Sequence, residues 1–387
     1  MLVAGSERQV AAFESATGNL IKMFKGSEAV AVCGSKFGVL AAQKSPLILQ
    51  FGKKESAMAK NVLPEKIACL SVSPCSRFLA CGAQSGRLLV WCLESGQLLA
   101  ARDAHFSAVS SLTWSRDSAV LASGGEDARI LVWNLFELSS LANSSCEPLV
   151  LTGHALKVTD LHIGQGIWRE ARLFSCSVDG NVCVHHLATL ERLATLSAGT
   201  AVSRLCVDPA ERVVYASTEG GVLCIPLYRV VNNRLEAVCG LGSIIACEDA
   251  AALVGSAPAT AICLSPDATL LFVGDTKGVV STWDVGTKQL IRSTKPLDGA
   301  IQTVCLLEYE PQLFPTLQRT VGQQADIVLP QSTTKIDLDI TQADIVGCWS
   351  GAANEGSSAA LSEIQELKKK NKQLQESYDK LWAEANE

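Results

Sequence analysis

Short apolar runs recur along the chain, and turn residues such as Gly, Asp, Ser and Pro separate each run from the next. Three copies of the pattern are clear, over residues 73–91, 115–133 and 265–284. Each contains a turn, an apolar strand, a tight turn and a second strand that reaches a Trp. Short strands that repeat at a regular interval, with turn signals between them, are typical of the blades of a β-propeller.

Weaker copies fill the rest of the first 307 residues. The position that holds Trp in the clear copies is occupied, in chain order, by Phe13, Phe51, Trp91, Trp133, His185, Ile225 and Trp283. These positions lie roughly 40 to 60 residues apart, which is the length of one blade with its loops. The pattern therefore predicts seven blades, of which the second is the most degenerate.

The two ends of this region predict how the ring closes. The first copy begins at its second strand, because no inner strand precedes Leu2. After the last copy, residues 299–307 match the opening strand of other copies, such as residues 68–72. We expect 299–307 to pair with the N-terminal strands and complete the first blade, which would remove exposed sheet edges.

Dipeptides within the copies resemble those of WD40 repeats. Trp283 and Asp284 form the Trp-Asp pair that gives that family its name, and Gly153 and His154 form its Gly-His pair. The resemblance implies a seven-bladed WD40 β-propeller, a fold that mostly serves to bind other proteins.

The fourth copy is the most complete. His105, Ser123, Asp127 and Trp133 match the hydrogen-bonded His–Ser–Asp–Trp chain of WD40 repeats. The resemblance implies that Asp127 holds the tight turn and orients His105, and that Trp133 caps the network. A His, Ser and Asp set also suggests a catalytic triad, but its match to a WD40 repeat favours a structural role.

Two stretches exceed the length of the repeat. Residues 136–152 lie between the fourth and fifth blades, and residues 228–257 lie between the sixth and seventh. Long insertions on a rigid ring are either binding elements or tolerated drift, and the sequence leaves both open. Residues 308–360 are an irregular strap that ends in a flexible linker rich in Gly, Ser and Ala.

The last segment, residues 361–387, changes period. Residues 362–382 contain no Gly or Pro, and helix formers dominate. The apolar residues and one Asn fit a heptad repeat, with Ile364, Asn371 and Tyr378 at a and Leu367, Leu374 and Leu381 at d. An Asn at one a position fixes register and favours a parallel two-stranded coiled coil. We therefore predict an α-helical coiled-coil tail that forms a homodimer, with packing on the propeller as the alternative.

Composition narrows the function further. The formal net charge of −6 argues against direct binding of a phosphate backbone, although a local basic face stays open. We find no signal peptide and no apolar run long enough to span a membrane. No P-loop, GxSxG, HExxH or GxGxxG motif is present, so we expect neither catalysis nor a cofactor.

The cysteines offer one chemical alternative. The chain has 15 of them, scattered mostly through apolar strands and without a CxxC pair. Buried free cysteine behaves as a small apolar residue and fits a reducing compartment. A zinc site that uses Cys176 and Cys183 with His185 or His186 lacks the paired spacing of known sites, so we favour the structural interpretation.

The order of features resembles one WD40 family in particular. Residues 151–162 read Leu-Thr-Gly-His-Ala-Leu-Lys-Val-Thr-Asp-Leu-His, the second blade lacks its Trp, and a Leu/Lys/Asn-rich helix ends the chain. This arrangement is similar to the family of WD-repeat-containing protein eighteen, called Ipi-three in yeast, over nearly the whole chain. The residue pattern itself indicates a scaffold propeller with a dimerising helix.

That resemblance implies a subunit of a Rix-one (PELP-type) complex that acts on nuclear pre-60S particles during removal of the internal transcribed spacer. It implies a helical-repeat scaffold subunit and the AAA protein midasin as partners, a nuclear and nucleolar location, and only indirect contact with nucleic acid. The cytoplasm stays open as a second location. The main alternative is a WD-repeat substrate receptor of a ubiquitin ligase, or another cytoplasmic adaptor.

Overall fold

The computed structural model describes most of the first 306 residues. The exceptions in this range are residues 7, 16, 25–28, 36–37, 52–56, 140–146, 232–233, 238–242, 247–250, 255–257 and 295–296. The strap, the linker and the helix expected over 308–387 lie outside the described residues. The six residues assigned to the a and d positions therefore stay a prediction.

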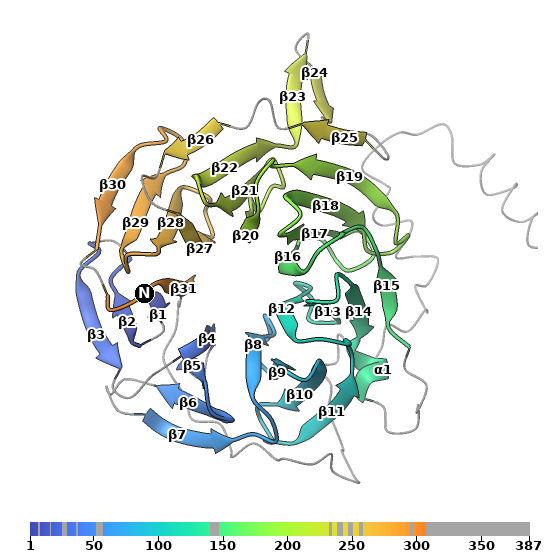
Figure 1. Ribbon diagram of the computed structural model, residues 1–387, viewed down its shortest axis with the longest axis vertical. Helices are drawn as coiled ribbons and strands as arrows, with labels where there is room; N and C mark the ends of the chain where they lie inside the picture. The colour runs from blue at the N-terminus through green and yellow to red at the C-terminus, as the bar shows by residue number, and fades with distance from the viewer. Residues whose placement is uncertain are drawn as a thin grey trace, which may run out of the picture. The chain divides into compact units, whose positions relative to one another are not determined.

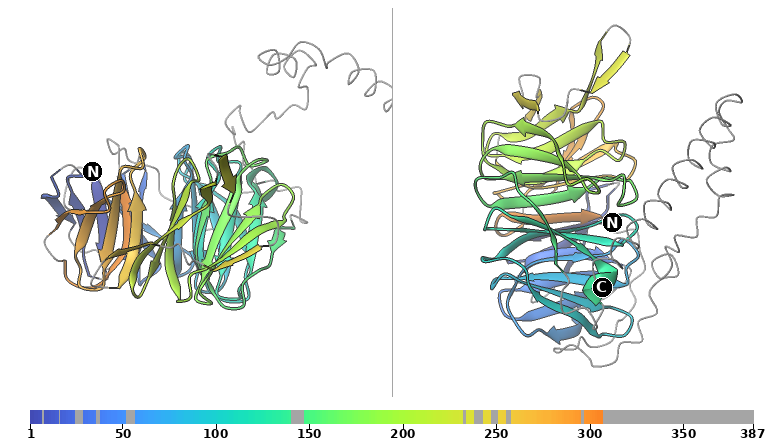
Figure 2. Two further views of the ribbon diagram at one scale, coloured as in Figure 1. Left: turned by 90° about the horizontal axis from the view of Figure 1, so that it is seen from above. Right: turned by 90° about the vertical axis from the view of Figure 1, so that its right-hand side faces the viewer.

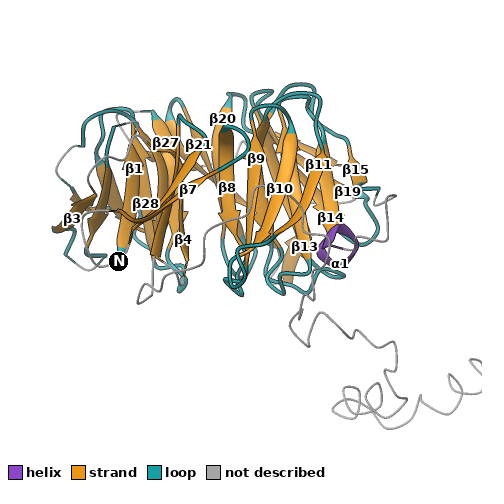
Figure 3. Ribbon diagram, turned by 90° about the horizontal axis from the view of Figure 1, so that it is seen from below, coloured by secondary structure: helices purple, strands orange, loops and turns teal. Residues whose placement is uncertain are grey.

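Seven sheets built from the described residues stand around a central axis as the blades of a propeller (Figure 1). Each blade is antiparallel and has four strands from the axis outward, and the fifth blade carries one further strand. Seen from the side, the strands run between two ends that carry the loops (Figures 2 and 3). This architecture confirms the prediction of an all-β, seven-bladed propeller.

The first three blades contain the following strands, in order from the axis outward. Blade one consists of β31 (Ile301–Leu306), β1 (Leu2–Ser6), β2 (Val10–Phe13) and β3 (Leu20–Phe24). Blade two consists of β4 (Ala29–Ser35), β5 (Gly38–Gln43), β6 (Leu47–Phe51) and β7 (Ala57–Val62). Blade three consists of β8 (Ile67–Val72), β9 (Phe78–Ala83), β10 (Arg87–Cys92) and β11 (Leu98–Asp103).

The other four blades follow the same order. Blade four consists of β12 (Val109–Trp114), β13 (Val120–Gly125), β14 (Ile130–Asn134) and β15 (Leu149–Leu151), and the short helix α1 (Leu135–Ser139) follows β14. Blade five contains β16 (Val158–Ile163), β17 (Arg172–Ser177), β18 (Asn181–His186) and β19 (Arg192–Ser197). Blade six contains β20 (Val202–Val207), β21 (Val213–Thr218), β22 (Gly221–Pro226) and β26 (Ala251–Val254). Blade seven contains β27 (Ala259–Leu264), β28 (Leu270–Asp275), β29 (Val280–Asp284) and β30 (Leu290–Ser293).

Blade one joins the two ends of the propeller sequence. Its inner strand β31 pairs antiparallel with β1, in a register that places Leu2 opposite Leu306 and Ala4 opposite Val304. Near the end of this pairing, Oγ of Ser6 donates a hydrogen bond to the backbone carbonyl of Asp298 over 2.9 Å. The backbone groups of β1 are therefore paired on both sides, by β2 and by β31.

Apolar side chains pack neighbouring blades face to face. Between blades seven and one, Leu2 and Phe13 pack with Phe272, Val280 and Ile301, and all five are 2% exposed or less. Burial of one side chain of this size contributes roughly 1.5–3 kcal/mol. Across the ring, six of the seven Trp-equivalent positions are likewise at most 2% exposed, so the repeat position that the sequence marks is a core position.

Side-chain hydroxyl groups also tie consecutive inner strands together. Ser110, Thr159 and Thr260 occupy the same place in β12, β16 and β27, where a β-bulge leaves one residue unpaired. Each hydroxyl group donates to a backbone carbonyl of a following inner strand: Ser110 to Val158, Thr159 to Val202, and Thr260 to Ile301. The bulges thus form polar links between blades around the axis.

The two stretches expected as insertions between blades contain parts of the blades themselves. β15, within 136–152, is the outer strand of blade four, and β26, within 228–257, is the outer strand of blade six. The expectation that these stretches lie between blades is therefore corrected. β15 has only three residues, too few to show the alternation of apolar and polar positions that marks a strand in sequence.

The second stretch also reaches the neighbouring blade. β23 (Tyr228–Val231) and β24 (Arg234–Ala237) form a separate hairpin that projects from the rim (Figures 1 and 2). β25 (Ser243–Ala246) then pairs in parallel with β19, and the chain returns to blade six as β26. Because β25 covers the outer edge of blade five, the stretch links blades five and six by backbone hydrogen bonds.

Candidate functional site

A buried hydrogen-bond network joins four side chains of blade four. His105, in the loop before β12, places Nδ1 at 3.0 Å from Oδ1 of Asp127 and Nε2 at 3.0 Å from Oγ of Ser123. Trp133 of β14 donates a hydrogen bond from Nε1 to the same Ser123 oxygen over 3.1 Å. The structure therefore brings together the four residues that the repeat pattern singled out.

Asp127 connects this network to the loop backbone. Its Oδ2 accepts the N–H of Phe106 at 3.2 Å, and its Oδ1 accepts the N–H of Arg129 at 3.2 Å. Burial would raise the pKa of Asp127, but His105 and these N–H groups outweigh burial and lower it. Burial lowers the pKa of His105, and the opposing effect of Asp127 is smaller. Near neutral pH the carboxylate is therefore charged and the imidazole neutral.

This arrangement does not serve as a catalytic triad. Ser123 is 0% exposed, and its oxygen lies between the His105 ring and the Trp133 indole. A nucleophilic hydroxyl must reach a substrate atom, and this one has no open side. The geometry instead holds the loop before β12 against the turn between β13 and β14.

Blade five contains a second network of the same kind. His154 places Nδ1 at 3.2 Å from Oδ2 of Asp179 and Nε2 at 2.9 Å from Oγ of Ser175. Asp179 also accepts the N–H of Ala155 at 3.0 Å and that of Asn181 at 2.9 Å. The Gly-His pair marks this copy of the repeat in the sequence, but the network was not predicted, because the expected Trp is absent.

His185 occupies the place of that Trp. The side chain is 1% exposed, and neither ring nitrogen forms a well-aligned hydrogen bond to a described residue, although a contact with the backbone of Thr152 opposes the fall in its pKa. Burial lowers the pKa of His185 to about 4, so the ring is neutral in the folded protein. Blade five therefore keeps the His–Ser–Asp part of the network and replaces its aromatic cap with an imidazole.

Cys176 and Cys183 do not come together as zinc ligands, because Cys176 lies opposite Val182 and Cys183 opposite Ser175, which places the two side chains on opposite faces of blade five. Burial raises the thiol pKa of both Cys176 and Cys183, which disfavours the thiolate that zinc requires. Among the described residues, no group of three or more His, Cys, Asp and Glu side chains is arranged to hold a metal ion. The observed role of Cys176 and Cys183 is packing, since both are buried.

Arg204 of β20 reaches from blade six to two other blades inside the central channel. Its Nη1 lies 3.9 Å from Oδ1 of Asp160 in blade five, and its Nη2 donates to the backbone carbonyl of Gln302 in blade one over 3.3 Å. Burial raises the pKa of Asp160, and the charge of Arg204 opposes this rise. Arg204 and Lys157 line a pocket of about 490 Å³ here, so cationic groups border this part of the channel.

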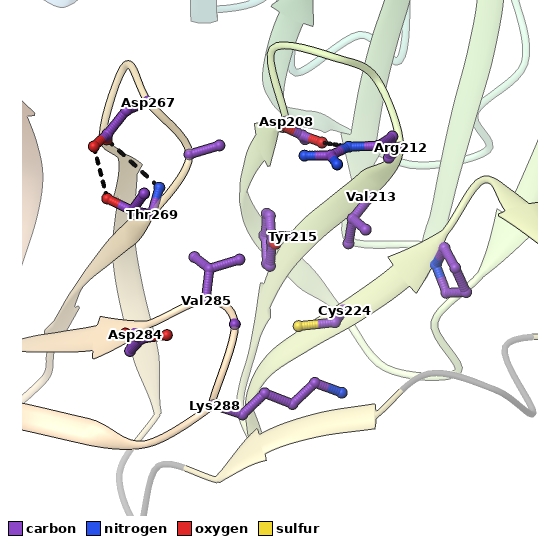
Figure 4. A pocket seen from close by; sticks show the side chains of 13 residues that line it. Asp208, Arg212, Val213, Tyr215, Cys224, Asp267, Thr269, Asp284, Val285 and Lys288 are labelled. Carbon is purple, nitrogen blue, oxygen red and sulfur yellow. Dashed lines mark hydrogen bonds and ion pairs between the residues drawn. The ribbon is translucent and has the colours of Figure 1, made fainter.

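A second pocket of about 670 Å³ lies between blades six and seven (Figure 4). Asp208 accepts a hydrogen bond from Nε of Arg212 over 2.7 Å, and Asp267 accepts one from Oγ1 of Thr269 over 2.8 Å. Tyr215 lies on β21, the strand that follows the Asp208 turn (Figure 4), and burial raises its pKa to about 12. The third carboxylate of the lining, Asp284, accepts the N–H of Thr287 over 2.9 Å, so turn contacts engage all three carboxylates of the described lining and leave none free as a general base.

Two features of the described region escaped sequence analysis. The Gly153-His154 pair could have indicated the network of blade five, because it belongs to the same repeat pattern as the network of blade four. The contact between Arg204 and Gln302 has no signal in the sequence, because it joins residues far apart along the chain.

No helix among the described residues has both the length and the apolar character to cross a membrane.

Comparison with protein families and with known proteins agrees with the repeat pattern. Residues 61–92 and 96–134, which cover most of blades three and four, match the WD40 family, described as WD domain, G-beta repeat. The crystal structure of the computationally designed Ika8 protein has the same fold, with a TM-score of 0.55 and 20% identity over 78% of this chain and 86% of that protein.

Several relatives carry a functional name. The chain is 27% identical to the pre-rRNA-processing protein crb3/ipi3 of Schizosaccharomyces pombe, over 98% of this chain and 96% of that protein. It is 29% identical to the pre-rRNA-processing protein IPI3 of Yarrowia lipolytica, over 85% and 83% of the two chains. It is 27% identical to human WD repeat-containing protein 18, over 66% and 58%.

Proposed function

We propose that this WD40-repeat propeller is a non-catalytic scaffold subunit of a nuclear complex that assembles pre-60S ribosomal particles and processes the internal transcribed spacer of pre-rRNA. The observation that carries the proposal is the match to the S. pombe pre-rRNA-processing protein over 98% of the chain. This match extends beyond the WD40 repeats into the C-terminal segment.

The chemistry of the described residues supports a scaffold. The two His–Ser–Asp networks are buried and hold loops, and Ser123 and Ser175 are both 0% exposed. In the pocket between blades six and seven, turn contacts hold the carboxylates of Asp208 and Asp267. A rigid ring with loops at both ends is suited to holding several proteins at once.

The partners that we propose are protein surfaces. A helical-repeat scaffold subunit and a midasin-type AAA protein are the first candidates, and the C-terminal helix joins two copies of the chain. Contact with pre-rRNA is indirect in this proposal, since the net charge of −6 does not favour a phosphate backbone. We propose the nucleolus and nucleoplasm as the location of the complex, because pre-rRNA is processed there, with the cytoplasm as a second location.

Complementation tests this function. S. pombe cells depleted of crb3/ipi3 are supplied with the full chain, and pre-rRNA that retains the internal transcribed spacer is measured by northern blot. We expect the depleted cells to accumulate this precursor and the chain to reduce it. A chain that is expressed and nuclear but leaves the precursor unchanged would contradict the proposal. Deletion of residues 299–307 provides the negative control.

A further inference from the structure

Phe106 is the most exposed large apolar side chain among the described residues. It lies in the loop before β12, and 83% of its surface is open to solvent. No other exposed apolar side chain in the described region exceeds 57%. Exposed aromatic side chains that are held in place are frequent anchors of protein interfaces.

The buried network of blade four fixes Phe106 and its neighbour Arg129. Asp127 accepts the backbone N–H groups of both residues, one on each carboxylate oxygen, at 3.2 Å. The guanidinium carbon of Arg129 lies 4.8 Å from the centre of the Phe106 ring. Binding therefore costs little ordering entropy, because the pair is already positioned.

The surface around Phe106 continues onto blade five. Glu126 accepts a hydrogen bond from Oγ of Ser107 over 3.3 Å, and its other oxygen lies 3.9 Å from Nζ of Lys157. β12 and β16, which follow these two loops, are neighbouring inner strands (Figure 1). Leu156, beside Lys157, is 52% exposed. Two apolar and two cationic side chains thus share one end of the ring.

We propose that Phe106, Arg129, Leu156 and Lys157 form a docking surface for an acidic, extended segment of a protein partner that carries an apolar side chain. The inference deepens the proposed scaffold function and rests on it. Arg129 has no carboxylate partner in the described part of the chain, and Glu126 meets Lys157 only at 3.9 Å. Carboxylates of the partner would pair with both cations while its apolar side chain covers Phe106 and Leu156.

The observations favour a protein segment over RNA. Leu156 offers apolar area but no ring on which a base can stack, and the Arg129 guanidinium already covers one side of the Phe106 ring. The net charge of −6 also weakens non-specific attraction for a polyphosphate. Lys157 and Arg204 also line the pocket of about 490 Å³, so an extended acidic chain bound at Phe106 can continue into this pocket.

Site-specific photocrosslinking tests the surface. The full chain is expressed in cells with p-benzoylphenylalanine in place of Phe106 and, as a matched control, in place of Phe136. Phe136 is 55% exposed on α1, in the connection from β14 to β15, at the opposite end of the blade. Crosslinked products are digested and sequenced. We expect an acidic segment with an apolar residue at the crosslink from position 106 and not from position 136.

Charge variants sharpen the test. Arg129→Glu combined with Lys157→Glu should reduce the yield at position 106 by about tenfold or more, whereas Arg129→Lys should preserve most of it. A yield no higher than at position 136, a crosslinked segment without acidic residues, or a product that nuclease removes would each overturn the proposal. The readout does not depend on pre-rRNA. Complementation without this crosslink would therefore overturn the proposed docking surface alone. The crosslink without complementation would overturn the proposed function alone.

Discussion

Arg204 donates a hydrogen bond from Nη2 to the backbone carbonyl of Gln302 over 3.3 Å, although blade seven separates their blades. Gln302 belongs to β31, the strand that joins the end of the propeller sequence to β1. One side chain therefore secures the closing strand from within the channel, in addition to the backbone pairing of blade one.

Arg204→Met should destabilise the propeller. The change removes this bond and leaves the partly buried Asp160 without its cation, while desolvation already raises the pKa of that carboxyl. We expect a loss of about 1–2 kcal/mol in the free energy of unfolding, a modest value because Arg204 is 32% exposed. Urea denaturation measures the loss. The double variant with Asp160→Asn should regain part of it, and an unchanged unfolding midpoint in the single variant would contradict the argument.

Ser123→Ala should cost more stability than Ser175→Ala. In blade four the hydroxyl group serves both His105 and Trp133, so its removal leaves the indole N–H buried without an acceptor. An unsatisfied buried donor costs about 1–3 kcal/mol. In blade five the equivalent hydroxyl group of Ser175 serves His154 and, over a long 3.4 Å, the backbone carbonyl of Cys183, and no indole depends on it because His185 replaces the Trp. Equal losses in thermal melting would show that the Trp bond contributes nothing.

His185 should make the propeller sensitive to acid. Its pKa falls from 6.5 to about 4 on folding, so below pH 6.5 the unfolded chain takes up a proton that the folded chain refuses. The contribution of neutral His185 to the free energy of unfolding is therefore fully present above pH 6.5. It decreases toward pH 4 by about 1.4 kcal/mol per pH unit for one proton.

His185→Phe removes this titrating group. The free energy of unfolding should then change less steeply between pH 6.5 and 4, by about the slope that one proton causes. Urea unfolding at several pH values measures that slope. His162, whose pKa burial also lowers to about 4, keeps its own contribution in the variant. A slope identical to that of the unchanged chain would mean that folding leaves the pKa of His185 near its ordinary value.

The fold could be predicted from the sequence because each blade has its own local pattern of strands and turns. The turn at 73–77 and the strand that contains Trp91 lie within twenty residues, and local propensity determines both. The same locality exposed His105, Ser123, Asp127 and Trp133, since the network lies within one blade. Outer strands such as β15 were not predictable, because their pairing depends on a neighbour rather than on their own short sequence.

The candidate surfaces were less predictable for a related reason. Hydrophobicity alone suggests that Phe106 is a core residue. Only the folded loop shows that 83% of its surface is exposed and that the Arg129 guanidinium lies beside its ring. The parallel pairing of β25 with β19 joins segments about fifty residues apart and follows no short-range rule. Tertiary contacts of this kind carry no local signal.

Deletion of residues 299–307 should unfold or aggregate the propeller. The deletion removes β31, leaves the edge of β1 unpaired and takes away Ile301, which is 0% exposed between blades seven and one. Unpaired strand edges promote association between chains. Thermal melting and size-exclusion chromatography measure the effect. Deletion of residues 308–387, which keeps β31, is the control and should leave the melting transition in place.

Leu367→Asp combined with Leu374→Asp should convert a dimer into a monomer. Both residues occupy predicted d positions of the coiled-coil tail, and a carboxylate there would be buried against its copy in the partner helix. Light scattering on the full chain measures the mass, and an unchanged circular dichroism spectrum of the β-propeller serves as the control. Three heptads form a short coil, so the measurement includes the helical-repeat partner. A monomeric unchanged chain in the presence of that partner would contradict the assignment of these residues to a dimer interface.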